Sequence, residues 1–396
     1  MVSWKLWGLY YLGGYGLCFT AAMDSLTDAA IARLFTVGFH GTSPSRELEA
    51  LLDRGVGGVI LFARNVDTPE QVLDLTRSIK RRAGRPVFVG VDQEGGRVRR
   101  LRSGFTDVPA MRSLGLTGDA ALARGVGQLL GRELRAVGID VNFAPVVDVD
   151  TNPNNPVIGD RSLSSEAGVV AELGAALVEG LQGAGVAACA KHFPGHGDTE
   201  QDSHATLPRL AHGLERIERV ELVPFARVVD AGVASIMTAH VLIDALDAEH
   251  PATLSQAVLS DLLRRRSRFD GVVFSDDLEM AAIAGRCEPG VAAVRALQAG
   301  VDNLLVCHSS IVAHAMIDAV AGAVRDGTLP EARVREAARR GAALSQRFAA
   351  PPQVSSDLSI LACEEHRRLV ERIRRGTQGA SELAADPTDY ARRGDA

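Results

Sequence analysis

The densest group of chemically reactive side chains in this chain lies between residues 190 and 204. It reads Ala-Lys-His-Phe-Pro-Gly-His-Gly-Asp-Thr-Glu-Gln-Asp-Ser-His and follows the apolar segment Val186–Ala190. That segment is typical of a buried strand, whereas Pro194, Gly195 and Gly197 end a strand and permit a loop. A buried strand is therefore expected to deliver a lysine, three histidines and two aspartates to a loop at its carboxyl end.

One histidine of this loop, His204, is suited to proton transfer because the pKa of an unperturbed histidine lies near neutrality. Asp202 precedes it by two residues. In a turn, the carboxylate of Asp202 can hold one ring nitrogen and leave the other free. An ordinary surface loop is the alternative, and the surrounding cluster favours the catalytic interpretation.

A second chemical signal is Asp276. The apolar run Val272–Ser275 ends in two adjacent carboxylates, Asp276 and Asp277. Adjacent side chains of a strand point to opposite faces, so we expect only one to face the interior. We predict that Asp276 is a nucleophile and that Asp277 caps the next helix or orients its neighbour. An aspartate nucleophile and a histidine acid together can cleave a glycosidic bond.

Lys191 and His192 come directly after the predicted strand. A lysine at such a position loses solvation unless a carboxylate or sugar hydroxyls accept its hydrogen bonds. His196 and Asp198 lie in the following turn, where they either take part in the chemistry or hold the shape of the loop. Lys191 and His192 are therefore candidate ligand-binding residues.

Two further segments carry candidate binding residues. Asp92 is the first polar residue after the strand Val87–Val91, and Arg100 can reach back over the same site. Arg161 offers a planar pair of donors suited to two hydroxyls or an anionic group. Its alternative role is a salt bridge to Asp160 or Asp148.

The fold that must position these residues is a (β/α)8 TIM-type barrel. Eight apolar runs alternate with amphipathic stretches, which favours a parallel sheet. The predicted strands are Phe35–Phe39, Gly57–Phe62, Val87–Val91, Val141–Val147, Val186–Ala190, Ser235–Ala239, Val272–Ser275 and Asn303–Val306. The predicted helices include Pro69–Arg82, Asp119–Val137, Glu166–Gly183, Gly213–Ala231, Ser255–Arg265 and Val291–Ala299. Polar residues follow nearly every strand, and in a barrel all of these positions meet at one mouth.

The two ends of the chain do not follow this pattern. Residues 1–22 form an apolar extension or a weak signal-like segment, too short and broken for a stable membrane span. We expect residues 23–350 to form a single catalytic barrel. Residues 351–396 are expected to form a linker, a helix over Asp357–Arg375 and a flexible polar tail.

Composition narrows the partners and the compartment. Hydrophobic residues make up 46% of the 396 residues, the net charge is −6 and no basic patch stands out, which argues against nucleic acid as a partner. The five cysteines include no CxxC pair and are expected to be reduced thiols. We expect a cytoplasmic protein, or an exported one if residues 1–22 act as a signal.

The motifs together resemble those of family 3 glycoside hydrolases. They are Lys-His-Phe-Pro-Gly-His-Gly-Asp-Thr with Asp-Ser-His, Asp-x-Glu-Gly-Gly-Arg-Val, Gly-Asp-Arg-Ser and Ser-Asp-Asp-Leu. The likeness is to the branch of bacterial β-N-acetylglucosaminidases of peptidoglycan recycling, and it covers roughly Leu26 to Phe348. It implies a retaining exo-β-N-acetylglucosaminidase that removes GlcNAc from GlcNAc-1,6-anhydro-MurNAc, with or without peptide.

The resemblance also implies roles for single residues. Asp276 is then the nucleophile, and His204 is the acid/base with Asp202 as its partner. The expected ligands of the GlcNAc ring are Asp92, Arg100, Arg161, Lys191 and His192. No cofactor or metal is expected, the partner is a small carbohydrate or muropeptide, and the chain is expected to be a monomer.

Two alternatives stay open. A metal-dependent barrel hydrolase would use the histidines and aspartates of the 191–204 loop as ligands, although no HExxH helix is present. A non-catalytic sugar-binding barrel is the other. Activity that survives EDTA removes the first, and turnover of a chromogenic GlcNAc glycoside removes the second.

Overall fold

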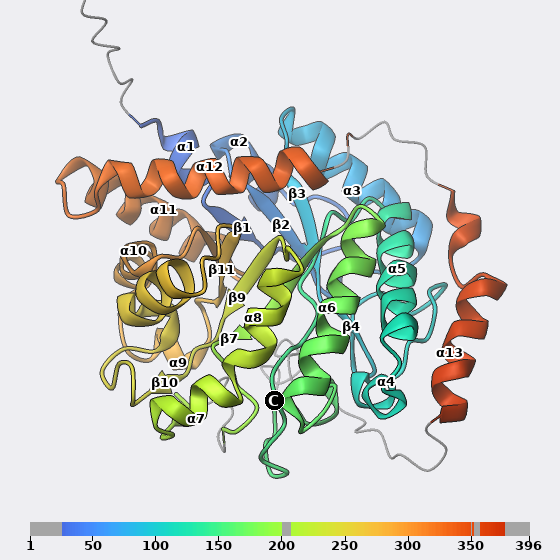
Figure 1. Cartoon of the computed structure of the whole chain (residues 1–396). Coiled ribbons are helices and arrows are strands. Elements are labelled where there is room, and N and C mark those ends of the chain that lie inside the picture. The colour runs from blue at the N-terminus through green and yellow to red at the C-terminus, as the bar shows by residue number, and fades with distance from the viewer. Residues whose placement is uncertain (1–25, 200–206, 350, 352–356, 377–396) are drawn as a thin grey trace, which may run out of the picture.

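The eight apolar runs form a closed barrel of parallel strands in the computed structural model of the chain (Figure 1). The structure describes residues 26–199, 207–349, 351 and 357–376. Around the barrel the strand order is β1, β12, β11, β9, β7, β6, β3 and β2. The strands are β1 (Phe35–Val37), β2 (Gly58–Leu61), β3 (Phe88–Val91), β6 (Val141–Asn142), β7 (Ala187–Phe193), β9 (Ser235–Thr238), β11 (Val272–Asp277) and β12 (Asn303–Val306). The predicted (β/α)8 barrel is confirmed.

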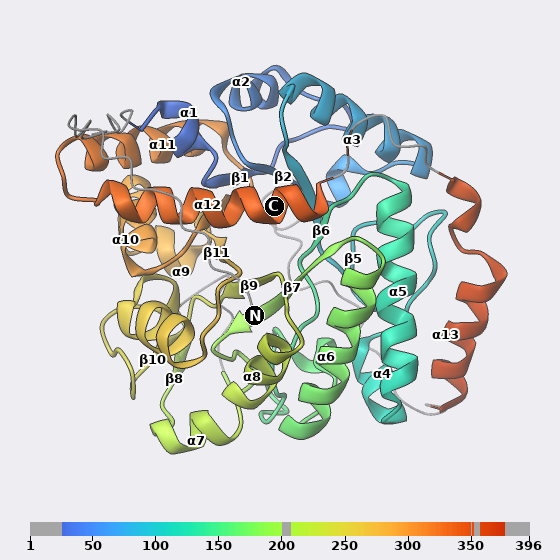
Figure 2. The same ribbon diagram turned by 45° about the horizontal axis from the view of Figure 1, so that its top comes forward.

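Helices surround these strands (Figure 2). The longer ones are α2 (Arg46–Arg54), α3 (Pro69–Ala83), α5 (Ala120–Ala136), α6 (Ala167–Gly183), α8 (Leu222–Asp230), α10 (Pro289–Ala299), α11 (Ser310–Arg325), α12 (Glu331–Phe348) and α13 (Glu364–Gly376). Shorter ones are α1 (Asp28–Ala32), α4 (Met111–Thr117), α7 (Leu214–Arg219) and α9 (Ala281–Ala284). A π-helix spans Ala257–Arg266, and two small ribbons pair β4 (Gln93–Gly95) with β5 (Val98–Arg99) and β8 (Arg209–Leu210) with β10 (Leu242–Ile243). None of the described helices has the length and apolar character needed to span a bilayer.

Local sequence signals fix several helix ends. Thr68 caps α3 by accepting a hydrogen bond from the backbone N–H of Gln71, and Pro69 occupies the first turn. Gly84 ends the same helix in the left-handed conformation that glycine adopts most easily. These caps explain why the predicted helix Pro69–Arg82 matches α3 to within one residue.

Two predicted helices differ from the structure. The stretch Gly213–Ala231 is broken into α7 and α8 near Glu221, a buried carboxylate that accepts hydrogen bonds of 2.6 and 2.7 Å from Arg216. The stretch Asp357–Arg375 begins with a 3₁₀ turn, Leu358–Ile360, before α13 starts. Both breaks depend on contacts with distant parts of the fold or on local caps, which periodicity does not reveal.

The barrel interior is a separate apolar cluster from the layer between strands and helices. It contains Phe88, Phe143 and Phe274, whose rings meet edge to face at 5.3 and 5.8 Å. Leu344 and Phe348 of α12 belong to the same cluster. Helix α12 therefore closes the amino-terminal end of the barrel, opposite the end at which the candidate site residues gather.

Two buried aspartates strengthen that closed end, each just before a strand. Asp302 accepts hydrogen bonds from the backbone of Val273 at 3.0 Å and from Arg333 at 2.7 Å, and it pairs with Arg264 and with Arg340 at 3.4 Å. Its side chain is fully buried. Each such carboxylate joins its own strand to a neighbouring strand and to helical cations.

The second aspartate, Asp140, makes the equivalent contacts before β6. It accepts a bond from the backbone of Val89 at 2.9 Å and pairs with Lys80 at 2.8 Å and Arg135 at 3.3 Å. Strand register at the closed end is thus held by charge-assisted hydrogen bonds as well as by apolar packing.

We predict that Asp302→Ala lowers the free energy of unfolding by about 3–5 kcal/mol, because it leaves buried arginines without their carboxylate. Urea denaturation followed by circular dichroism measures this. The control is Asp270→Ala, which removes an 87% exposed partner of Arg340 and should cost less than about 1 kcal/mol. Equal losses in the two variants would contradict the assigned role of Asp302.

Candidate active site

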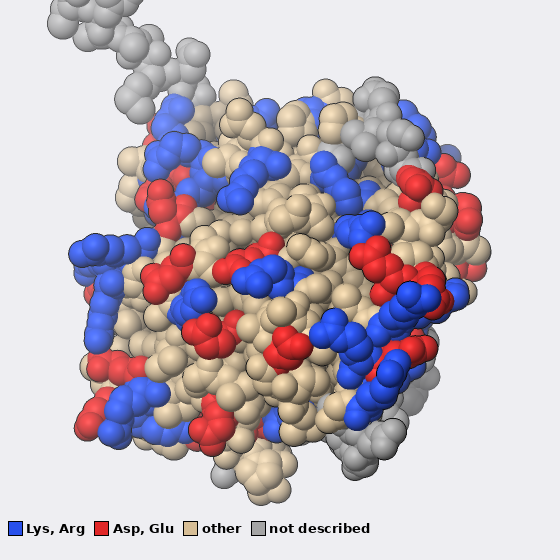
Figure 3. Space-filling model, turned by 45° about the vertical axis from the view of Figure 1, so that its right-hand side comes forward, with Lys and Arg blue, Asp and Glu red and all other residues tan. Residues whose placement is uncertain are grey.

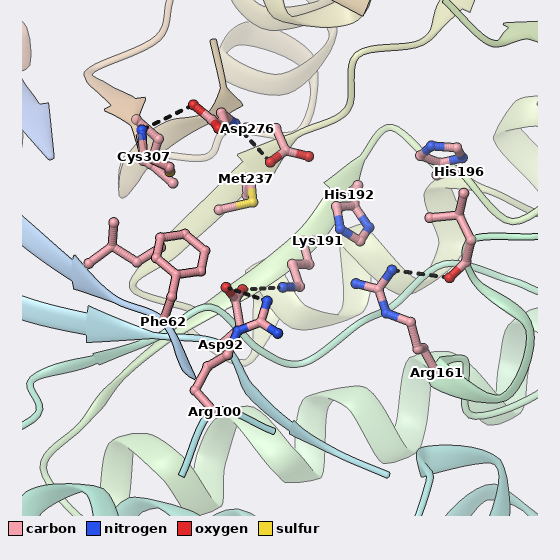
Figure 4. Close-up of a pocket in the computed structure, with 14 residues that line it drawn as sticks. Phe62, Asp92, Arg100, Arg161, Lys191, His192, His196, Met237, Asp276 and Cys307 are labelled. Atoms are coloured by element: carbon pink, nitrogen blue, oxygen red, sulfur yellow. Dashed lines mark hydrogen bonds and ion pairs between the residues drawn. The ribbon is translucent and has the colours of Figure 1, made fainter. Parts of the chain in front are cut away.

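A pocket lies at the carboxyl ends of the barrel strands and encloses about 570 Å³ of space, part of it open to solvent (Figure 4). Its lining includes Asp276 and all five predicted binding residues. The lining residues are Ile60, Phe62, Asp92, Arg100, Val157, Arg161, Lys191, His192, His196, Met237, Asp276, Asp277, Leu305 and Cys307. Side chains separated by up to 184 positions, from Asp92 to Asp276, thus face one cavity.

Lys191 is the centre of an ionic network at one side of the pocket. Its ammonium nitrogen lies 2.8 Å from Asp92 and 2.6 Å from Glu94. Glu94 in turn accepts two hydrogen bonds of 2.8 Å from the guanidinium of Arg161. Arg100 lies 3.5 Å from the second oxygen of Asp92. The network fixes two cations and a half-buried carboxylate in positions from which they can meet the hydroxyl groups of a ligand.

Glu94 is a site residue that sequence reasoning missed. Arg161 was expected to pair with Asp160 or Asp148 if it had a structural role. Its partner is Glu94 instead, 67 positions away, and Asp160 pairs with Arg97 at 3.0 Å. The only sequence signal was that Glu94 stands two residues after Asp92 in the motif Asp-x-Glu-Gly-Gly-Arg-Val.

The charges of this network are stabilised by one another. Burial alone would raise the pKa of Glu94, but the Arg161 and Lys191 cations hold it well below its usual range. Burial opposes the charge of Lys191 as well, and Asp92 and Glu94 nevertheless raise the pKa of its ammonium. Glu94 and Lys191 therefore stay charged at neutral pH.

His192 is oriented by a buried carboxylate, Asp148. The Nδ1 atom of His192 lies 2.7 Å from Asp148, which also accepts hydrogen bonds from the backbone of His192 at 3.2 Å and of His196 at 2.8 Å. With Nδ1 donating to Asp148, Nε2 of His192 is left as the ring nitrogen for a ligand. Asp148 is fully buried and lies behind the pocket lining.

His196 lies beside His192 at the edge of the pocket, with ring centroids 6.1 Å apart. Its Nδ1 shares a hydrogen bond of 2.6 Å with the hydroxyl of Thr199. Burial, together with the neighbouring His192, lowers the pKa of His196 to about 4, so its ring is neutral at physiological pH. A neutral ring held by Thr199 fits the interpretation that His196 maintains the shape of the loop.

Asp276 lies across the pocket from Asp92 and Arg100 (Figure 4). One of its oxygens accepts a hydrogen bond of 2.8 Å from the backbone of Asp277. Asp277 is nearly buried and accepts bonds from the backbones of Glu279 at 3.1 Å and Cys307 at 3.2 Å. Asp277 therefore joins β11 to β12 and fixes the place of its neighbour.

Strand alternation fails at two places that matter for the site. Asp276 and Asp277 both line the pocket, and so do Lys191 and His192, although adjacent strand residues were expected to face opposite sides. The strand register shifts between Phe274 and Asp277 in β11 and between Ala190 and Phe193 in β7. Such irregularities redirect side chains, which explains how two consecutive residues reach one cavity.

The remaining wall of the pocket is apolar and was also missed. It includes Phe62, Met237 and Leu305, which stand within or directly after predicted strands. The guanidinium of Arg64 lies 4.4 Å from the ring centre of Phe62, and that of Arg100 lies 5.6 Å from it. An apolar wall facing a polar one suits a ligand such as a pyranose, which has both kinds of surface.

Two of the predicted catalytic residues, His204 and Asp202, lie outside the described residues. The chain is described up to Thr199 and again from Leu207. Among the residues that the structure describes, no three His, Cys, Asp or Glu side chains are placed to hold a metal ion together. The described cysteines, Cys189, Cys287, Cys307 and Cys363, are free thiols.

Comparison with known proteins gives a consistent result. A sequence model of the glycosyl hydrolase family 3 N-terminal domain matches residues 26–344. A β-hexosaminidase of Thiobacillus denitrificans is 41% identical over 355 residues, which cover 87% of this chain and 94% of that protein. A β-hexosaminidase of Pseudomonas aeruginosa is 46% identical over 258 residues, covering 64% of this chain and 75% of that protein.

Solved structures agree with these relatives. A family 3 β-N-acetylglucosaminidase from Paenibacillus sp. FPU-7 superimposes with a TM-score of 0.85 at 43% identity, covering 89% of this chain and 69% of that one. NagZ from Neisseria gonorrhoeae, in complex with N-trifluoroacetyl-D-glucosamine, superimposes with a TM-score of 0.73 at 33% identity, covering 87% of this chain and 97% of that one.

The buried pair of Glu94 predicts a specific pH dependence. The folded pKa of Glu94 lies below its ordinary value of 4.5, so its contribution to stability is present above that pH and is lost as the pH falls toward the folded pKa. We expect the free energy of unfolding to decline more steeply between pH 4.5 and about pH 3 in the wild type than in Glu94→Gln. Urea denaturation over a pH series measures both slopes. Glu70→Gln, at an exposed position of α3, should keep the wild-type slope, and a wild-type slope in Glu94→Gln would refute the prediction.

Proposed function

This chain belongs to glycosyl hydrolase family 3, and from that premise we propose that it is a retaining exo-β-N-acetylglucosaminidase. The proposed substrates are peptidoglycan fragments, GlcNAc-1,6-anhydro-MurNAc with or without peptide, from which it removes the terminal non-reducing GlcNAc. The observation that carries the proposal is that Asp276 shares one pocket with the five residues expected to hold the sugar ring. The relatives named β-hexosaminidase and the β-N-acetylglucosaminidase structure support the same activity.

In this proposal, the ionic network binds the hydroxyl groups of GlcNAc. Asp92 accepts hydrogen bonds from adjacent hydroxyls, while Lys191, Arg100 and Arg161 donate to their oxygens. His192 adds Nε2 as a further polar group, since Nδ1 is held by Asp148. These groups are fixed by one another before a ligand arrives, so binding requires little further ordering of the protein.

The chemistry proposed for the pocket has two steps. First, a carboxylate oxygen of Asp276 bonds to the anomeric carbon as the bond to the leaving oxygen breaks, and His204 gives its proton to that oxygen. Second, water attacks the same carbon, His204 takes a proton from the water, and the bond to Asp276 breaks. GlcNAc leaves with its original anomeric configuration because the carbon is inverted twice.

Asp276 is suitably placed to act as the nucleophile. Its side chain is partly exposed within the pocket, and one oxygen is engaged by the backbone of Asp277. Asp202 is proposed to hold one ring nitrogen of His204 so that the other can exchange protons with the substrate. Both residues belong to a loop that begins beside the pocket-lining His196.

We predict that Asp276→Ala lowers kcat on a fluorogenic GlcNAc glycoside by at least about 10³-fold, because no covalent intermediate can form. In the wild type, a 5-fluoro GlcNAc donor should label Asp276, as shown by mass spectrometry of the digested protein. Binding of GlcNAc, measured by calorimetry, should survive in the variant. Near-normal turnover or a label on another residue would refute the assignment.

We predict that His204→Ala slows substrates with poor leaving groups more than those with good ones. A leaving oxygen of low basicity departs without a proton, so it does not need the acid. A series of aryl GlcNAc glycosides of increasing phenol pKa measures the dependence of kcat/KM on leaving-group basicity. The dependence should be steeper in the variant, and equal losses across the series would argue against proton transfer by His204.

A further inference from the structure

Helix α13 lies outside the segment matched by the family, which ends at residue 344, and it packs beside α4 and α5 (Figure 1). His366, Val370 and Ile373 are the buried residues of its inner face. Its exposed residues include pairs of opposite charge, and Figure 3 shows that basic and acidic side chains are interspersed over this side of the molecule. The inner face of α13 therefore holds the information about its role.

Glu133 of α5 connects α13 to a loop of the barrel mouth. Its side chain is nearly buried and accepts hydrogen bonds from His366 at 2.9 Å and from the backbone of Ala362 at 2.8 Å. The same carboxylate accepts bonds from Thr106, at 2.5 Å from the hydroxyl and 3.0 Å from the backbone. Burial opposes the charge of Glu133, yet these bonds, that of His366 first, hold the pKa of its carboxyl below its usual value.

The backbone at the start of α13 is shaped for this contact. Ala362 has a φ of 45°, in the left-handed region that costs a residue with a side chain of its own about 1 kcal/mol or more. In that conformation its N–H reaches Glu133. A strained residue persists where surrounding contacts determine it, so the approach of α13 to Glu133 is a specific feature of the fold.

The loop held by Glu133 leads directly to the pocket. Asp107 follows Thr106 and pairs both with Arg374 of α13, at 2.6 Å, and with Arg99 of β5. Arg99 precedes Arg100, the pocket residue. The contacts thus run from α13 through two adjacent loop residues to the immediate neighbour of Arg100.

Gln93 holds the other side of Arg100. Its side-chain oxygen accepts hydrogen bonds of 3.0 Å from the backbones of Arg100 and Leu101, and its amide donates to Leu101 at 2.8 Å. The backbone of Val108 accepts a bond of 2.9 Å from Gly96, which returns the loop to the β4–β5 ribbon. The segment from Gln93 to Val108 is therefore one closed unit, anchored by Gln93 inside the barrel and by α13 outside it.

We propose that α13 is a positioning element of the substrate pocket: through Glu133, Thr106 and Asp107 it fixes the loop that presents Arg100 to the sugar. This inference rests on the proposed role of Arg100 as a GlcNAc ligand. It assigns a function to the segment after the barrel, which acts on substrate affinity without touching substrate.

The first test removes one hydroxyl. Thr106→Val keeps the shape of the side chain and deletes its bond to Glu133. We expect KM for a chromogenic GlcNAc glycoside to rise roughly three- to tenfold with kcat unchanged, as the loss of one hydrogen bond to loop placement predicts. The matched control is Thr76→Val, which deletes a buried hydroxyl bond of 2.8 Å to the backbone of Val137 in another part of the barrel. It should lower thermal stability without raising KM.

The second test changes α13 itself at exposed positions that leave the fold intact. Arg374→Ala breaks the pair with Asp107 and should raise KM roughly two- to fivefold, the range for an exposed ion pair. Arg375→Ala, one residue on, removes a pair with Glu371 only and should leave KM unchanged. High salt should reduce the difference between these two variants.

A double-mutant cycle with Arg100→Ala separates this inference from its premise. If α13 acts through Arg100, then Thr106→Val and Arg374→Ala change KM in the wild type but not in the Arg100→Ala background. Equal effects in both backgrounds, or no effect of either variant on KM, would overturn the inference. If Arg100→Ala itself leaves KM unchanged, the premise about the sugar ligand fails, whatever α13 does.

Discussion

Four side chains of opposite charge, Asp92, Glu94, Arg161 and Lys191, depend on each other at the edge of the pocket. Removing a charge from water costs several kcal/mol, and a buried ion pair offsets that cost only when its geometry is good and its remaining hydrogen bonds are made. Here the arginine meets Glu94 with two bonds and the lysine meets two carboxylates. The polar wall of the pocket is possible because these charges compensate one another. A ligand then meets groups already aimed at it.

The two ends of the barrel separate stability from chemistry. At the amino-terminal end, Asp140 and Asp302 are enclosed by cations and by the backbone of a neighbouring strand, and α12 covers the interior. At the other end, the polar groups face a cavity that is open to solvent. Because the strands are short, a single apolar layer containing Phe88, Phe143 and Phe274 separates these two polar regions. The closed end can therefore hold strand register while the open end carries side chains that pack less tightly.

Irregular strands and supporting residues shape the open end. The register shifts in β7 and β11 bring two consecutive side chains of each strand into the pocket. Residues behind the lining then fix what the strands present: Asp148 orients His192, Asp277 holds the backbone beside Asp276, and Gln93 holds that of Arg100. Their number shows why a site of this kind needs a large scaffold. Each group that meets the ligand is held by at least one other group that does not.

The sequence by itself determined the eight strands, most helix ends and the residues that gather at the mouth. Apolar runs, caps such as Thr68 and Gly84, and polar residues placed after strands are local features, and a closed parallel barrel must bring its strand ends together. The motifs and the family they resemble supplied the roles expected of those residues. Tertiary structure alone decided the pairing of Arg161 with Glu94, the support of His192 by Asp148, the break between α7 and α8, and the docking of α13 on Glu133. Those contacts join residues far apart in the chain, and their geometry depends on how loops fold back over the barrel, which neither periodicity nor residue type encodes.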